Sequence, residues 1–95
     1  MLGNKSDLYS VEYLKQVVAN DIPLLPKKMR ETIKLAIETR LVQDPVGFGK
    51  PLQYSLKGHR RLRVGHYRVV YRIDLDNHIA IISAIKHRKD VYQNH

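Results

Sequence analysis

The sequence predicts an α+β fold in which two N-terminal helices pack on one face of a small antiparallel sheet. Two observations favour this class: apolar residues at helical spacing occur only before residue 43, and alternating apolar and polar residues dominate positions 60–85. Helices in one block followed by strands in the next are typical of an α+β domain. The expected order is β-α-α-β-β-β. With 95 residues, the chain can bury one modest core, so residues 1–95 are predicted to form a single domain.

The first half of the chain is predicted to contain one strand and two helices. Residues 8–13 (LYSVEY) alternate and are rich in aromatic and β-branched types, which favours a strand, although they could also begin the next helix. Apolar residues at helical spacing cover 14–22, until the prolines at 23 and 26 break the helix. With Pro26 in its first turn, a second helix is predicted to run to about Val42. Its apolar stripe consists of Met29, Ile33, Ala36, Ile37 and Leu41.

Asp44-Pro45 is predicted to end this helix, because the residue before a proline is disfavoured in the α region. Residues 46–51 (VGFGKP) are rich in Gly and Pro and predict a loop that crosses to the strands. Leu52 and Leu56 are the expected core anchors on the way.

Residues 61–71 (RLRVGHYRVVY) predict a β-hairpin with one apolar and one basic face. Gly65-His66 suits a two-residue turn, which pairs Val64 with Tyr67 and Arg63 with Arg68. Because side chains alternate along a strand, the two faces separate. The apolar face holds Leu62, Val64, Tyr67, Val69 and Tyr71, and the basic face holds Arg61, Arg63, Arg68 and Arg72. Opposed like charges destabilise a sheet by about 0.2–1 kcal/mol per pair, so this face favours a bound anion, with phosphate the obvious one.

A last strand is predicted over residues 79–85, after a turn around Asp76-Asn77. A turn of two residues and a turn of three would place Ile79, Ile81 and Ile85 on opposite faces, and the sequence leaves both open. The final segment, residues 87–92, predicts a short polar stretch with at most one helical turn.

The positive charge belongs to the second half of the chain. The formal net charge is +8; residues 1–49 hold seven basic and six acidic side chains, and residues 50–95 hold ten basic and three acidic. This asymmetry indicates a polyanionic partner, namely nucleic acid, an acidic protein or an anionic membrane surface. The chain has no cysteine, which excludes disulfides and thiolate chemistry and fits a reducing cytoplasm. No stretch approaches the roughly 18 apolar residues of a membrane span, so a cytoplasmic protein without a membrane segment is predicted.

Metal-independent RNA cleavage needs a base for the 2′-OH, cations around the developing charge and an acid for the leaving oxygen. Arginine suits the cation but not the base, because its pKa lies above ~12. Histidine titrates closest to working pH, and His87 is the best placed of the five. A histidine at a strand end is more often structural, and the basic face could simply be solvated, so these alternatives stay open. No HExxH, phosphate loop or paired carboxylates occur, so no metal or cofactor is expected.

A series of short motifs spans residues 44–92. In order they are Asp44-Pro45, Gly49-Lys50-Pro51-Leu52, Leu56-Lys57-Gly58, the hairpin 61–71 and His87-Arg-Lys-Asp-Val-Tyr92. Their order and spacing resemble the RelE/ParE superfamily of bacterial toxins from type II toxin–antitoxin modules. The RelE branch implies a ribosome-dependent endoribonuclease that enters the A site and cuts mRNA with the mRNA's own 2′-OH. The ParE branch implies a toxin that inhibits DNA gyrase without nuclease activity, and the motifs occur in both branches.

The resemblance assigns expected roles to the hairpin arginines. Arg61 and Arg63 fall where RelE-type enzymes place basic groups before the hairpin turn. Arg68 matches the arginine expected to hold the scissile phosphate.

The resemblance also assigns roles near the C-terminus. Arg88 and Tyr92 lie where the family has a functional arginine and a stacking or orienting tyrosine. His87 resembles the C-terminal histidine of some relatives.

One departure from the best-known RelE pattern concerns the general base. That pattern has lysines at the positions of Arg61 and Arg63, and a guanidinium cannot readily take the role proposed for lysine. Either His87 replaces it, or turnover is slow, or the chain is not a ribonuclease. We favour the ribonuclease over the gyrase inhibitor, with non-catalytic nucleic-acid binding third. Either toxin implies an acidic, RelB-like antitoxin whose partly disordered tail would wrap the domain and neutralise its basic face.

Overall fold

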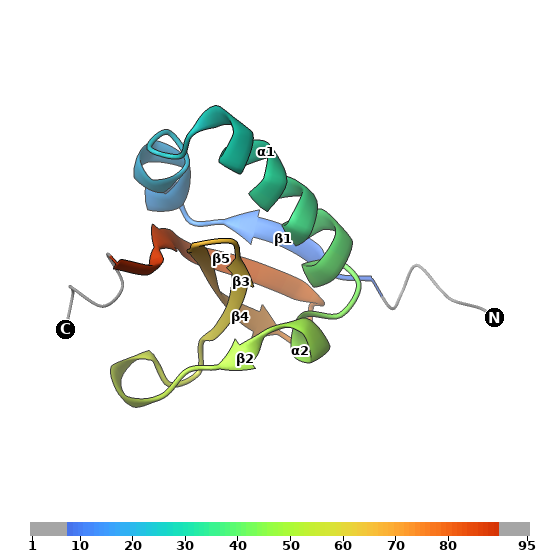
Figure 1. The fold of residues 1–95 in the computed structure, drawn as a ribbon. Helices are drawn as coiled ribbons and strands as arrows, with labels where there is room; N and C mark the ends of the chain where they lie inside the picture. The colour runs from blue at the N-terminus through green and yellow to red at the C-terminus, as the bar shows by residue number, and fades with distance from the viewer. Residues whose placement is uncertain (1–7, 90–95) are drawn as a thin grey trace.

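The computed structural model describes residues 8–89, apart from the side chain of Ser55. Five strands form one sheet in the order β1-β5-β4-β3-β2, and the long helical segments cover one of its faces (Figure 1). The strands are β1 (Ser10–Tyr13), β2 (Lys50–Pro51), β3 (Arg60–Val64), β4 (Tyr67–Asp74) and β5 (Ile79–His87). The predicted α+β class, with helices on one face, is confirmed.

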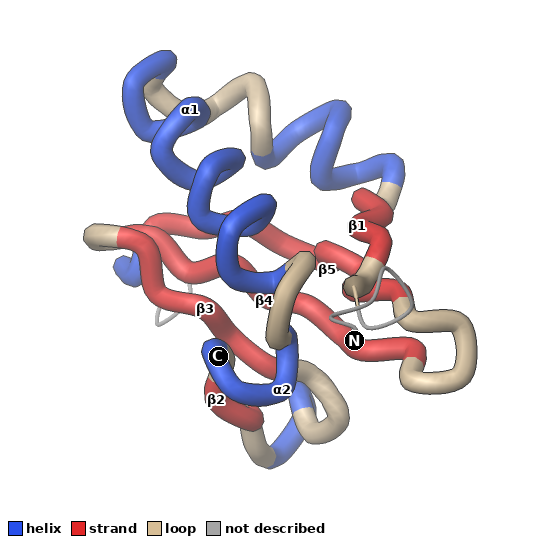
Figure 2. Tube along the Cα trace, turned by 90° about the vertical axis from the view of Figure 1, so that its right-hand side faces the viewer, coloured by secondary structure: helices blue, strands red, loops and turns tan. Residues whose placement is uncertain are grey.

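The helical layer consists of two pieces joined by a proline-containing turn. The first is a π-helical segment, η2 (Val17–Asp21); the second is α1 (Lys27–Ala36), which continues as a π-helical segment, η3 (Ile37–Leu41). Pro26 is the N-cap residue of α1, just before the first turn in which it was predicted, and its carbonyl accepts the Arg30 N–H at 2.9 Å. The predicted apolar stripe is buried at Ile33, Ala36, Ile37 and Leu41, and α1 lies over the sheet (Figure 2). No helix within residues 8–89 has the length and apolar character to cross a membrane.

The predicted hairpin forms in the predicted register. Val64 pairs with Tyr67 and Arg63 with Arg68, and Gly65 takes the positive φ of 60° that the tight turn requires. The apolar face of the hairpin meets the helices and closes the core. The buried core residues are Val17, Leu25, Ile33, Ala36, Ile37, Leu41, Leu62, Val64, Val69, Tyr71, Ile82 and Ile85.

The sheet is not antiparallel throughout, because β1 pairs with β5 in parallel. The meander β3–β4–β5 is antiparallel, as expected for strands joined by short turns. After β1, by contrast, the helices carry the chain to the opposite edge of the sheet. A connection of that length imposes no antiparallel direction on β1.

Residues 45–51 are more ordered than the predicted loop. Asp44 does end the long helix, but it also caps a new one, α2 (Pro45–Phe48), because its carboxylate accepts a hydrogen bond from the Gly47 N–H at 2.9 Å. Aspartate before a proline in the first turn is a helix-start signal that the sequence already contained. A single 3₁₀ turn, η4 (Tyr54–Leu56), follows β2. The predicted core role of Leu56 is wrong, since its side chain is 40% exposed.

The β4–β5 connection has neither two nor three residues. Asp74 pairs with Ile79, which leaves a loop of residues 75–78. The pairing then shifts, because Val70 faces Ala84 whereas Tyr71 faces Ile82. Ser83 is the extra residue of this β-bulge, and its hydroxyl donates to the Val70 carbonyl at 3.2 Å. The bulge lets Ile82 and Ile85, three residues apart, both enter the core.

Candidate nucleic-acid interface

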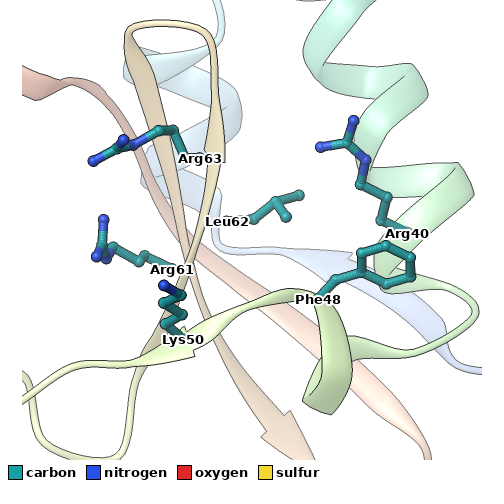
Figure 3. Close-up of a pocket in the computed structure, with 6 residues that line it drawn as sticks. All are labelled: Arg40, Phe48, Lys50, Arg61, Leu62 and Arg63. Carbon is teal, nitrogen blue, oxygen red and sulfur yellow. The ribbon is translucent and has the colours of Figure 1, made fainter.

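Three predicted site residues lie on the sheet face that the helices leave uncovered. Arg61, Arg63 and Arg68 are on this outer face, because they alternate with the buried residues of the hairpin. Arg61 and Arg63 point to the same side of β3 (Figure 3). The structure therefore brings these three residues together, and their roles stay predictions.

The three arginines differ in exposure. Arg63 is exposed and Arg61 half-buried, whereas Arg68 is only 9% exposed. Arg68 therefore lies on the predicted outer face but is buried there. The physical reason is its place in the sheet: β4 lies between β3 and β5, so Arg68 has neighbours on both sides.

Lys86, the β5 neighbour of Arg68, is tied to the helical layer. Its ammonium lies 2.8 Å from the carboxylate of Asp21, which is 6% exposed. The second oxygen of Asp21 accepts the Ile85 N–H at 2.9 Å. Asp21 therefore satisfies a backbone donor at the end of β5 and offsets one positive charge of the face.

His87 lies on the opposite side of the sheet from Arg68. It pairs with Tyr67, whose ring packs against the core, and the two rings meet edge to face with centroids 5.2 Å apart. The ring of His66, in the hairpin turn, lies 6.0 Å from that of His87. His87 therefore does not share the outer face with Arg61, Arg63 and Arg68.

One ring nitrogen of His87 accepts a backbone hydrogen bond. The Lys89 N–H donates to Nδ1 at 3.2 Å, so the neutral ring carries its own proton on Nε2. Nδ1 is the acceptor nitrogen of this hydrogen bond.

Arg88 begins a helical turn beside the hairpin tip. Its N–H donates to the His66 carbonyl at 2.8 Å, so the chain after β5 stays in contact with the hairpin turn. Tyr92, the last predicted site residue, lies outside the described residues. Within residues 8–89, no group of three or more His, Cys, Asp or Glu side chains is arranged to hold a metal ion.

A basic pocket of about 400 Å³ opens at the edge of β3, at the point where its pairing with β2 stops. It is lined by Arg40, Phe48, Lys50, Arg61, Leu62 and Arg63 (Figure 3). The sequence analysis missed Arg40 and Phe48. Arg40 is one of several basic residues of the predicted helix and Phe48 stands in a Gly- and Pro-rich segment, so neither gave a signal of its own. Only the fold brings them to the hairpin.

Two polar side chains fix the α2 segment against the sheet. The Tyr71 hydroxyl donates to the Pro45 carbonyl at 2.6 Å, and the Arg60 guanidinium donates to the carbonyls of Val46 and Gly49 at 2.7 and 2.8 Å. Burial raises the pKa of Tyr71 above its ordinary value, and Arg60 partly opposes this. A Cβ at position 49 would overlap the Tyr71 hydroxyl, so only glycine fits there.

Comparisons with known proteins define the class of this helix-covered sheet with a basic outer face. Residues 11–92 match the family described as ParE toxin of type II toxin-antitoxin system, parDE. The chain is 33% identical over 73 residues to toxin RelG of Mycobacterium tuberculosis, covering 77% of this chain and 84% of that protein. It is 36% identical over 75 residues to toxin RelE of the same organism, covering 79% and 77%.

A solved structure supports the same assignment. The toxin–antitoxin complex RelBE2 of Mycobacterium tuberculosis contains a chain with a TM-score of 0.80 and 30% identity, over 85% of this chain and 92% of that one. The protein therefore belongs to the RelE/ParE superfamily of type II toxins, as the motifs predicted.

Proposed function

We propose that this toxin is a metal-independent, ribosome-dependent mRNA endoribonuclease that inhibits translation. The observation that carries the proposal is the position of Arg61 and Arg63. Their guanidinium groups lie side by side at the uncovered sheet face, with no hydrogen bond or ion pair to any residue in 8–89. Sequence similarity to toxins that are themselves named RelE and RelG adds to this support.

Each proposed step is one that these side chains suit chemically. The 2′-oxygen attacks phosphorus and gives up its proton, the bond from phosphorus to the 5′-oxygen breaks, and that oxygen takes a proton. Negative charge grows on the non-bridging oxygens, and planar guanidinium groups are suited to bind them in pairs. We assign this stabilisation to Arg61, Arg63 and Arg68.

The proton transfers need a different group, because arginine stays charged at all working pH values. We assign one of them to Nδ1 of His87, which becomes available when the Lys89 N–H moves. Arg88 is assigned a phosphate contact, and Tyr92 a stacking or orienting role. Since His87 lies at the hairpin tip and not over the outer face, the scissile phosphate is expected to lie near that tip.

The proposed partner in the cell is an acidic, RelB-like antitoxin. The structural relative was solved as a toxin–antitoxin complex, and the net charge of +8 suits an acidic partner. Such a partner would also neutralise the basic face that the proposal assigns to mRNA and the ribosome.

Inhibition of DNA gyrase is the second candidate, because the matching family is described as ParE toxin. One experiment separates the two. Purified protein is added to translating ribosomes with end-labelled mRNA, and in parallel to a gyrase supercoiling assay. Cleavage that depends on ribosomes, with unchanged supercoiling, is expected. Loss of supercoiling with intact mRNA would replace the proposal by the gyrase inhibitor.

A further inference from the structure

The pocket at the edge of β3 has a composition suited to one class of ligand. Among the residues that the structure describes, its lining holds four cationic side chains, no carboxylate and one aromatic ring. The cations are Arg40, Lys50, Arg61 and Arg63. A nucleotide of a single strand carries a phosphate and a flat aromatic base, so it offers one partner for each kind of group.

The ring of Phe48 is exposed although the segment that carries it is firmly anchored. The side chain is 51% exposed, yet the backbone on both sides of it accepts hydrogen bonds from Arg60, at Val46 and Gly49. The start of the same short helix is held by the Tyr71 hydroxyl. Because the backbone is fixed before any ligand arrives, a base can stack on this ring with little ordering cost.

The cationic side chains of the pocket lie on both sides of β3. Arg40 and Phe48 approach the pocket from one side of β3, while Arg61 and Arg63 point away on the other (Figure 3). Lys50 is the direct partner of Arg61 in the β2–β3 pairing. A strand held by the hairpin arginines would therefore meet Lys50, and then Arg40 and Phe48, as it passes over the edge of the sheet.

We infer that this pocket binds a nucleotide of single-stranded RNA on the same path as the cleaved one, with its base stacked on Phe48 and its phosphate held by Lys50 and Arg40. The inference rests on the proposed function, since it extends the same RNA path beyond Arg61 and Arg63. It makes Phe48, Lys50 and Arg40 substrate-positioning residues outside the group that the motifs identified.

The free edge of β3 offers the competing occupant. β2 pairs only with Arg60 and Arg61, so an acidic peptide could add as a strand along residues 62–64. The aromatic ring distinguishes the two ligands, because strand addition depends on backbone hydrogen bonds and base stacking depends on the ring.

The test measures binding of a fluorescein-labelled, fully 2′-O-methylated RNA hexamer by anisotropy. Methylation blocks the attacking oxygen, so binding is separated from cleavage. Phe48→Leu is expected to raise the Kd about tenfold, consistent with stacking energies of about 1–3 kcal/mol, and Phe48→Trp to restore it. Arg40→Gln is expected to lower the slope of log K against log salt by about 0.7, the value for one phosphate contact on a single strand.

Leu24→Ala is the matched control, since Leu24 is an exposed apolar residue (80%) near the start of α1, at the other end of the helix from Arg40. This variant is expected to bind the hexamer as the wild type does. An unchanged Kd in Phe48→Leu would overturn the inference. The inference would also be overturned if Phe48→Leu weakened binding of an eight-residue peptide of alternating Glu and Val and left binding of the hexamer unchanged. That result would assign the pocket to a protein strand.

The two proposals fail in different ways. Wild-type cleavage of mRNA on ribosomes together with hexamer binding that ignores Phe48 rejects the pocket and keeps the nuclease. Hexamer binding that depends on Phe48, without cleavage by the wild type, rejects the nuclease and keeps the pocket as an RNA-binding site.

Discussion

Neighbouring arginines of β3 face opposite sides of the sheet and have different surroundings. Arg60 points toward α2 and donates to two backbone carbonyls. The side chains of Arg61 and Arg63 lie on the other face and make no hydrogen bond or ion pair to the described residues 8–89. The charge is the same, so the sequence position alone does not say whether an arginine stabilises the fold or is available to a ligand. The alternation of the strand decides it.

The largest effect is expected from the outer face. Replacing Arg61 and Arg63 together by glutamine should reduce ribosome-dependent cleavage by about 10²–10³-fold, because two charges that stabilise the transition state are lost. The urea midpoint should stay at the wild-type value, because neither side chain bonds to the described part of the protein. A double variant that cleaves normally would remove the outer face from the mechanism.

His87 tests whether the site extends beyond that face. His87→Gln should lower the cleavage rate by about 10²-fold if the ring transfers a proton, and it should flatten the acidic limb of the pH–rate profile. A rate reduced equally at every pH would instead indicate that the ring only supports Tyr67. The assay is single-turnover cleavage on ribosomes from pH 5.5 to 8.5.

Arg60→Ala tests the inner side of the same strand. The free energy of unfolding should fall by about 2–3 kcal/mol, since hydrogen bonds from a charged donor to the α2 carbonyls are lost. Urea denaturation measures this directly. Cleavage per folded molecule should fall far less than in the outer-face variant; an equal fall would mean that the division between the two sides of β3 is wrong.

The smallest effect is expected for Tyr71→Phe, which keeps the buried ring and loses the hydroxyl bond to Pro45, at about 1 kcal/mol. Its pH dependence has a defined sign. Burial raises the pKa of Tyr71 in the folded state above the ordinary value of 10.0, so the unfolded chain ionises first and stability falls as the pH rises beyond that value. The difference in urea midpoint between wild type and Tyr71→Phe should therefore shrink between pH 9 and 11.

The hairpin and the helical stripe could be predicted because local rules decide them. Gly65 set the turn, the turn set the register, and the register placed Arg61, Arg63 and Arg68 on one face. The parallel pairing of β1 and the bulge at Ser83 depend on contacts between distant segments, so no local sequence pattern predicts them.

The site was predicted in part for the same reason. The face of the hairpin arginines followed from the alternation of β3 and β4. The face of His87 depended on the bulge, and the burial of Arg68 depended on the strands beside β4. Phe48 reaches the pocket because Arg60 and Tyr71 hold α2 against the sheet, whereas Arg40 reaches it from η3.

The bulge at Ser83 also fixes the register of β5 against β4. If the ladder continued without the extra residue, Ile85 would stand beside Arg68, and Lys86 would turn beneath the helices beside Tyr67. That slip would expose an isoleucine among guanidinium groups and bury an ammonium, and both changes are unfavourable. The strand thus has one low-energy alignment, and the segment that follows it reaches the hairpin tip at a reproducible position.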